Sequence, residues 1–120
     1  MGAFATGQVV LLPFPFSDLS RSKYRPAAVL AEIGRGDWVL CQITSNPYAD
    51  DRAVELSQAA FAHGGLQRVS YARPGKLFTA HETLFAGVAG KLADIAHATV
   101  VDQVVRLLRP NETHIGETNS

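Results

Sequence analysis

Residues 34–36, Gly-Arg-Gly, link two apolar, partly β-branched runs at 25–33 and 37–44. Short glycine-containing links between such runs are typical of β-hairpins. A two-residue turn at Gly34-Arg35 places Arg25 opposite Thr44. A turn at Arg35-Gly36 places Arg25 opposite Asn46, two residues further along. Because side chains alternate along a strand, both placements leave Arg25 and Thr44 on the same face of the sheet. The sequence therefore predicts a guanidinium beside a hydroxyl at the open end of a hairpin.

The opposite face of this hairpin is the predicted core. Its side chains are all apolar: Ala28, Leu30, Val39, Cys41 and Ile43. The Arg25 face also holds Gln42, and Ser45 and Asn46 follow Thr44 directly, so the open end of the hairpin is polar.

Further short strands separated by glycine and proline signals follow the same pattern. We expect strands at 7–12, 53–56, 66–71, 76–80 and 84–92, loops at 17–24 and 46–51, a helical turn at 58–63 ended by Gly64-Gly65, and a break at Pro74-Gly75. Gly87 and Gly90 in the last strand indicate a bulge or close backbone packing.

One helix is expected at the end of the chain, capped by Asp94 and stopped before Pro110. Most of its apolar stripe should pack on the strands; the stripe comprises Val100, Val101, Val104, Val105 and Leu108. Many short strands followed by one helix indicate a mainly β (α+β) fold, a small closed barrel with a C-terminal helix. We expect a single domain over residues 1–110 and a flexible tail over 111–120.

The chain has 120 residues, no net charge and one cysteine, Cys41. This length supports one domain, and a lone cysteine excludes an internal disulfide. A neutral chain lacks the basic footprint of a dedicated duplex-DNA binder. Neither a signal-peptide pattern nor an apolar run of about 18 residues is present, so we expect a cytoplasmic protein that does not enter the membrane.

Charge is nevertheless unevenly distributed. Two clusters are basic and free of acids, one formed by Arg21, Lys23 and Arg25 and the other by Arg68, Arg73 and Lys76, and the acids Asp50, Asp51 and Glu55 lie between them. If the clusters meet in space, they form a local anion site on a neutral protein. Two separate solvated loops are the alternative.

The motifs of most other chemistries are missing. The four histidines show no metal-ligand spacing, and no nucleophile elbow, P-loop or dinucleotide fingerprint is present, so no cofactor is expected. What remains is a phosphate-directed site. Arginine binds phosphate oxygens and stabilises the charge that develops when an RNA 2′-hydroxyl attacks phosphorus, while a Thr or Ser hydroxyl donates to the same oxygens. Such chemistry needs no metal.

Several segments resemble the MazF/PemK family of toxins from bacterial type II toxin–antitoxin systems, and its PemK-like branch in particular. They are GQVVLLPFPFSDLS (7–20), KYRPAAVL (23–30), CQITS (41–45), FAHGGL (61–66) and SYARPGKLFT (70–79), followed by the terminal helix. The resemblance covers roughly residues 7–108.

The resemblance implies an SH3-like barrel of the CcdB/Kid/PemK type and a homodimer. It also implies an mRNA interferase, a sequence-specific endoribonuclease that cleaves single-stranded RNA to 2′,3′-cyclic phosphate and 5′-hydroxyl ends and is inhibited by a cognate antitoxin. By the same resemblance Arg25 and Thr44 are the catalytic residues, and residues 17–24 gate the RNA groove. The RNA-binding residues expected beside them are Asp18, Arg21, Lys23, Ser45, Asn46 and Arg73.

Some alternatives stay open. Arg73 contacts phosphate or forms a salt bridge with Asp50 or Asp51, and Asp18 orients Arg25 or serves as a turn residue. For the whole chain, the alternatives are a gyrase-directed toxin of the same fold and a non-catalytic SH3-like module that binds nucleic acid or protein.

Overall fold

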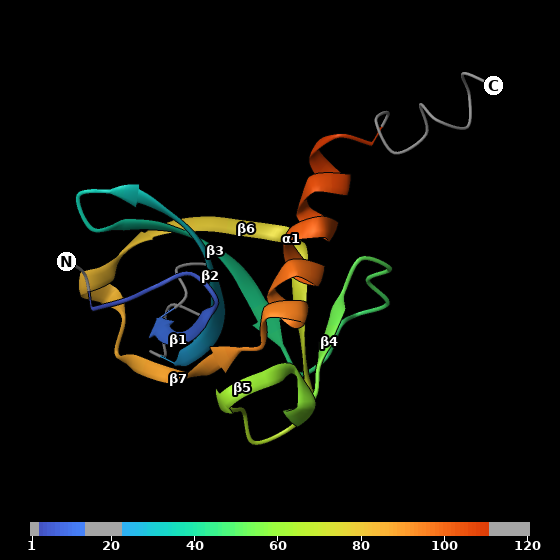
Figure 1. Ribbon diagram of the computed structural model, residues 1–120, viewed down its shortest axis with the longest axis horizontal. Coiled ribbons are helices and arrows are strands. Elements are labelled where there is room, and N and C mark those ends of the chain that lie inside the picture. Colours follow the sequence, from blue (N-terminus) through green and yellow to red (C-terminus); the bar gives the residue numbers. More distant parts are fainter. Residues whose placement is uncertain (1–2, 14–22, 111–120) are drawn as a thin grey trace.

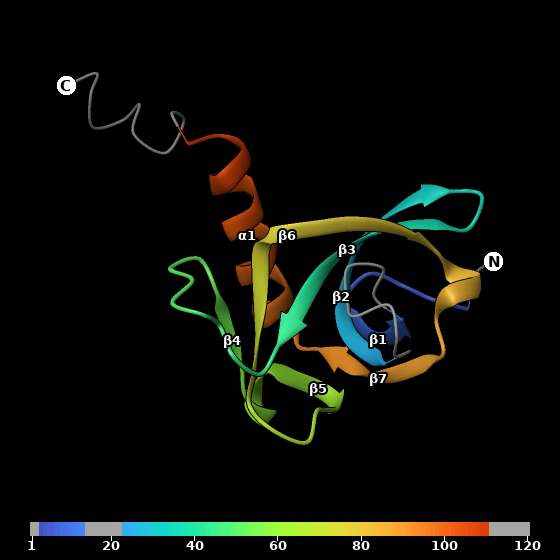
Figure 2. The ribbon, with the colours of Figure 1, turned by 180° about the vertical axis from the view of Figure 1, so that it is seen from behind.

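The computed structural model describes residues 3–13 and 23–110, which form one antiparallel sheet and a C-terminal helix (Figure 1). The seven strands are β1 (Gln8–Pro13), β2 (Tyr24–Gly34), β3 (Asp37–Thr44), β4 (Val54–Leu56), β5 (Phe61–Gly64), β6 (Ser70–His81) and β7 (Gly87–Leu92). Their order in the sheet is β4-β6-β3-β2-β1-β7-β5. The sheet curls into a nearly closed barrel, which brings its edge strands β4 and β5 to the same side of the molecule (Figures 1 and 2). The predicted barrel with a C-terminal helix is confirmed.

The β2–β3 hairpin turns at Arg35-Gly36, and both residues adopt positive φ angles, 57° and 85°. Two positive φ values are what a tight hairpin turn requires. This turn alone would place Arg25 beyond the end of β3, but two irregularities in the ladder each shift the register by one residue. The pairing then runs Ala28 with Cys41 and Ala27 with Gln42. The same register, carried two residues further, sets Arg25 across from Thr44.

Both faces of this hairpin are buried, so the prediction of a single core face is incomplete. The predicted face does contribute Ala28, Cys41 and Ile43 to one cluster, which also includes Val100 of the helix. The other face forms a second cluster, whose members are Val10, Leu12, Ala27, Val29, Trp38, Leu40, Ala80 and Phe85. The run from Pro26 to Leu30 is continuously apolar instead of alternating and is buried or half-buried throughout, as expected of a strand that is covered on both sides.

The segment between residues 58 and 81 departs from the prediction. The expected helical turn is a 3-10 helix, η1 (Gln58–Ala60), and Phe61–Gly64 forms β5, which pairs with β7. Residues 67–68 form a bend, and the strand predicted at 66–71 begins only at Ser70. Pro74-Gly75 does not end a strand, because β6 runs through it and the β3–β6 register shifts between Ala72 and Leu77. The proline, which has no N–H to donate, thus lies in a bulge.

The glycine prediction for β7 is confirmed at Gly90. The β1–β7 register shifts beside it, and a Cβ atom added at Gly90 would lie 2.7 Å from the His63 carbonyl oxygen and 2.8 Å from the Gly65 nitrogen. The strand itself begins at Gly87, because Leu84 lies in a second 3-10 helix, η2 (Glu82–Leu84).

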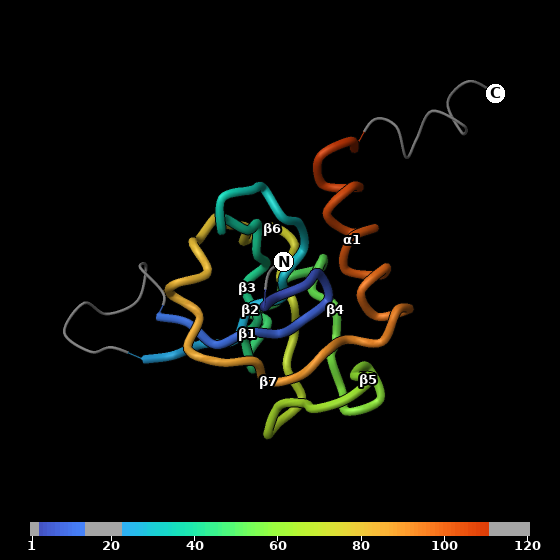
Figure 3. The backbone as a smooth tube through the Cα atoms, turned by 60° about the vertical axis from the view of Figure 1, so that its left-hand side comes forward, coloured from blue at the N-terminus to red at the C-terminus, as the bar shows by residue number. Residues whose placement is uncertain are grey.

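Helix α1 (Asp94–Leu108) contacts β6, β4 and β7. Its N-cap is Ala93, so Asp94 is the first helical residue and not the cap. Val100 is fully buried and Val101 and Val104 are half-buried, but Val105 and Leu108 are 46% and 68% exposed, so the predicted packing holds for the first part of the stripe and not for its end. The reason is that the C-terminal half of α1 projects beyond the barrel (Figure 3). No helix in the described part of the chain is long and apolar enough to cross a membrane. The expected tail, 111–120, lies outside the described residues.

Two glycine substitutions test the close approach of β5 and β7. Gly90→Ala should lower the free energy of unfolding by about 1–3 kcal/mol, because its methyl group meets backbone atoms that have no room to move. Gly75→Ala is the matched control, since a Cβ atom there meets nothing within 4 Å. Urea unfolding of the two variants measures the difference. Equal stabilities would contradict the close packing at Gly90.

Candidate functional site

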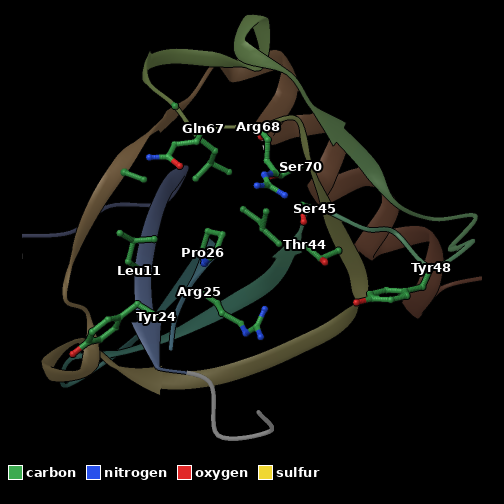
Figure 4. Close-up of a pocket in the computed structure, with 14 residues that line it drawn as sticks. Leu11, Tyr24, Arg25, Pro26, Thr44, Ser45, Tyr48, Gln67, Arg68 and Ser70 are labelled. Atoms are coloured by element: carbon green, nitrogen blue, oxygen red, sulfur yellow. Dashed lines mark hydrogen bonds between the residues drawn. The ribbon is translucent and has the colours of Figure 1, made fainter. Parts of the chain in front are cut away.

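A pocket of about 480 Å³ opens at the end of the β2–β3 hairpin that lies away from its turn (Figure 4). Its walls come from β1, β2, β3, the bend after β5 and the loop after β3. The lining residues are Leu11, Tyr24, Arg25, Pro26, Ile43, Thr44, Ser45, Tyr48, Gly65, Leu66, Gln67, Arg68, Ser70 and Ala89. The described residues of this lining include two arginines and no acid, so this part of the pocket is suited to an anion.

Arg25 and Thr44 lie in this pocket, as the hairpin register predicts. Arg25 lies in a strand that is paired on both sides. Its backbone is the partner of Leu12 in β1, and the other edge of β2 pairs with β3. Its side chain is exposed and forms no ion pair with any described residue. Figure 4 shows the guanidinium extending into the open part of the pocket below Thr44. An arginine held in this way keeps its charge available for a ligand.

The Thr44 hydroxyl has a defined orientation. Its oxygen accepts a hydrogen bond from the Asn46 backbone N–H at 3.2 Å. That bond occupies a lone pair and leaves the hydroxyl proton without an acceptor among the described residues. Thr44 can therefore donate a hydrogen bond into the pocket beside Arg25.

Arg68 is the second cation of the pocket, and sequence reasoning placed it in a basic cluster without assigning it to the site. It lies in the bend that follows Gly64 and Gly65, whose φ values are +69° and +157°. Ser70 fixes the far side of the bend by donating from its hydroxyl to the Arg68 carbonyl at 3.1 Å. The signal that was available is the Gly-Gly pair, which indicates a sharp change of chain direction and not the start of a regular strand.

The loop between β3 and β4 is held by its own polar side chains. Asn46 Oδ1 accepts from the Tyr48 N–H at 3.0 Å, and Asp50 Oδ1 accepts from the Arg52 N–H at 2.9 Å. The other oxygen of Asp50 accepts from Arg73 Nε at 3.0 Å. The Arg73 guanidinium lies 5.6 Å from the centre of the Tyr48 ring. The hydrogen bond from Arg73 lowers the pKa of Asp50 below its ordinary value of 3.8.

Only some of the other predicted site residues lie at the pocket. Ser45 lines the pocket, and Asn46 lies beside it through its bond to Thr44. Lys23 is exposed and is not part of the lining. Of the two roles considered for Arg73, the structure has the salt bridge with Asp50. Asp18 and Arg21 fall outside the described residues.

The two basic clusters meet only in part. Arg25 and Arg68 share the pocket, whereas Arg73 and Lys76 line a separate hollow together with Asp50, Asp51 and Arg52. Of the acids that separate the clusters in sequence, Asp50 and Asp51 lie in the second hollow and offset two of its three cations, and none is among the described residues that line the first.

Other reactive groups lie away from the pocket or are unsuited to chemistry. Burial raises the pKa of the Cys41 thiol to about 12, so this cysteine stays protonated and behaves as a small apolar residue. Within residues 3–13 and 23–110, no three His, Cys, Asp or Glu side chains are grouped closely enough to hold a metal ion.

The fold and pocket define a class: a small antiparallel barrel with a C-terminal helix and a positively charged hollow at one end. No protein-family model and no curated protein sequence matches the chain. Solved structures do match its fold. A MazE–MazF complex from Deinococcus radiodurans has a TM-score of 0.71 at 21% identity, covering 90% of this chain and 97% of that one.

Two mycobacterial structures are similar as well. An endoribonuclease in complex with its cognate antitoxin from a mycobacterial species has a TM-score of 0.66 at 13% identity, covering 90% of this chain and 95% of that one. The Mycobacterium tuberculosis toxin MazF-mt6 has a TM-score of 0.64 at 13% identity, covering 81% and 91%. The chain therefore has the fold of the MazF toxins, and the resemblance noted in its sequence is confirmed at the level of the fold.

The Asp50–Arg73 pair predicts a pH-dependent stability. A carboxyl whose pKa is lower in the folded than in the unfolded protein adds stability that is complete above the unfolded value and is lost as the pH falls through the folded value. Asp50→Asn keeps the acceptor for the Arg52 N–H but removes the charge. The variant should be less stable than the parent protein at about pH 7, and the difference should shrink once the pH falls below the ordinary carboxyl pKa of 3.8.

Urea unfolding across this pH range measures the difference. Asp51→Asn is the matched control, because Asp51 is exposed and makes no ion pair with a described residue. A stability loss in Asp50→Asn that stayed constant down to the lowest pH would show that the charge is not its source.

Proposed function

We propose that the protein is a metal-independent, sequence-specific endoribonuclease of the mRNA-interferase type, and that its pocket binds single-stranded RNA. The observation that carries the proposal is the meeting of Arg25 and the Thr44 hydroxyl in a pocket whose described lining contains no acid. The similarity in fold to a MazE–MazF complex and to a structure described as an endoribonuclease supports the same assignment.

In the proposed reaction the 2′-hydroxyl of one nucleotide attacks the adjacent phosphorus. The 2′-hydroxyl gives its proton to water, the O2′–P bond forms and the P–O5′ bond breaks. The departing 5′-oxygen takes up a proton from water, so the products are a 2′,3′-cyclic phosphate and a 5′-hydroxyl. Negative charge grows on the non-bridging oxygens, and Arg25 stabilises it with N–H groups that remain charged at any working pH. Thr44 donates its free hydroxyl proton to the same oxygens. Because the nucleophile belongs to the substrate, the reaction is restricted to RNA.

Arg68 holds a neighbouring phosphate in this proposal. It stands across the pocket from Arg25, on a different wall (Figure 4). Two cations on opposite walls attract a polyanion without giving the whole protein a positive charge. Arg68 binds substrate and transition state alike, so its contribution falls on KM more than on kcat.

The partners follow from the same assignment. Two of the similar structures are a MazE–MazF complex and an endoribonuclease with its cognate antitoxin, and we extend this to a toxin–antitoxin role for the present chain. An antitoxin as inhibitor, a homodimeric state and a cytoplasmic location belong to this proposal.

Substitution of the two central side chains tests the function. Arg25→Ala should lower kcat on single-stranded RNA by about 10²–10³-fold, because one stabilising group is removed from the transition state. Thr44→Ala should also lower kcat, and Thr44→Ser should restore much of it because the hydroxyl returns. Arg106→Ala, on the exposed side of α1, is the matched control and should cleave normally. Initial rates with EDTA present, on an RNA whose cut sites have been mapped, supply the measurement.

The chemistry has its own test in the substrate. An RNA with a 2′-deoxynucleotide at the mapped cut site should bind normally and remain uncut, because the nucleophile is missing. Cleavage of the deoxy substrate would overturn the 2′-hydroxyl mechanism. If the protein left all single-stranded RNA intact but arrested supercoiling by gyrase, the gyrase-directed alternative would replace the proposal.

A further inference from the structure

Tyr48 stands at the mouth of the pocket in an unusual backbone conformation. Its φ is 55°, and that of the next residue, Ala49, is 59°. Left-handed backbone is uncommon for residues other than glycine and costs free energy, and it persists where surrounding interactions hold it. The side chain is 66% exposed and belongs to neither core cluster. Packing of the fold therefore does not explain why the chain holds a tyrosine here in this way.

The interactions that hold Tyr48 come from three directions. Its own N–H donates to Asn46 Oδ1 on one side, and Asp50 caps the following turn on the other. Behind it, Arg73 lies against the ring and is fixed in turn by its bond to Asp50. The Arg73 and Asp50 side chains are only 19% and 13% exposed, so this support is largely shielded from water.

The ring is directed at the site. In Figure 4 it extends from the loop toward the pocket with its hydroxyl group leading, on the side of Thr44 and Arg25. Tyr24 also lines the pocket, but its ring points away from the centre in the same view. An exposed aromatic ring with one face against a guanidinium has its other face available, and nucleic-acid bases stack on such faces.

We propose that Tyr48 is a stacking platform for a base adjacent to the phosphate bound by Arg25, with Arg73 and Asp50 as the residues that position it. The inference rests on the proposed function, because it concerns the same pocket and the same substrate class. Stacking holds the substrate before and during reaction, so Tyr48 acts on substrate binding and not on the chemical step. It accepts any base and favours the larger rings of purines.

Direct binding tests the platform independently of cleavage. The probes are single-stranded RNA dodecamers of mixed sequence, 2′-O-methylated to prevent cleavage, each with one 2-aminopurine whose fluorescence is quenched by stacking. The parent protein should quench at least one probe position. Tyr48→Ala should abolish this quenching and weaken binding by about tenfold or more. Tyr48→Phe keeps the ring and should retain both, while Leu84→Ala, an exposed apolar residue outside the pocket lining, is the control.

Kinetics on a cleavable RNA separate binding from chemistry. Tyr48→Ala should raise KM by about the same factor and leave kcat within about twofold of the parent value. Arg73→Gln should raise KM less, and in the Tyr48→Ala background it should have no further effect, because its role is to hold the ring. Additive effects of the two substitutions would overturn the positioning role of Arg73.

The outcomes distinguish the two proposals. Normal cleavage by the parent protein, with unchanged KM and quenching in Tyr48→Ala, would overturn the platform and leave the endoribonuclease standing. Loss of quenching in both Tyr48→Ala and Tyr48→Phe would assign the effect to the hydroxyl group and overturn stacking. Tyr48-dependent quenching by a protein that cuts no RNA would support the platform and overturn the endoribonuclease. Failure to bind any probe would overturn the platform, and failure to cut RNA as well would overturn both.

Discussion

The register of the β2–β3 hairpin is the constraint on which the site depends. A one-residue error in pairing would move Arg25 to the opposite face from Thr44, since side chains alternate along a strand. The turn at Arg35-Gly36 by itself would place Arg25 opposite Asn46, two residues beyond Thr44. Each of the two irregularities in β2 shifts the pairing by one residue, so together they bring Arg25 opposite Thr44. Because β1 and β6 pair on either side of this hairpin, the corrected register is held by the whole sheet.

The electrostatics of the pocket depend on where the acids are placed. The chain carries as many acidic as basic side chains, yet the described residues that line the pocket include Arg25 and Arg68 and no acid. Asp50 is engaged by Arg73 on the far side of Tyr48, so its charge is balanced locally. A neutral protein can therefore present a positive pocket, and the zero net charge is no argument against a polyanionic ligand.

Sequence patterns could predict those parts of the fold that depend on local signals. The hairpin, the helix and the glycine contact at Gly90 follow from turn chemistry, periodicity and the absence of a Cβ atom. The bend at 67–68 could not be predicted, because residues 66–71 alternate like a strand and the shape of the bend is imposed by the glycines before it and by Ser70 after it. The exposed end of α1 was missed for a similar reason, since a stripe of valines does not reveal where the barrel ends. Arg25 and Thr44 could be paired in advance, whereas Arg68 and Tyr48 reach the pocket only through loop geometry.

The loop after β3 shows how the fold can maintain strain at a functional position. Two consecutive non-glycine residues in left-handed conformation are unfavourable, and glycine at position 48 would relieve part of that cost. The chain instead keeps a tyrosine and supports it with an ion pair that is mostly shielded from water. A pair of this kind adds little net stability in general, because desolvation offsets the attraction. Its effect is better understood as orientation: it fixes one ring at the edge of the cavity that contains Arg25 and Thr44.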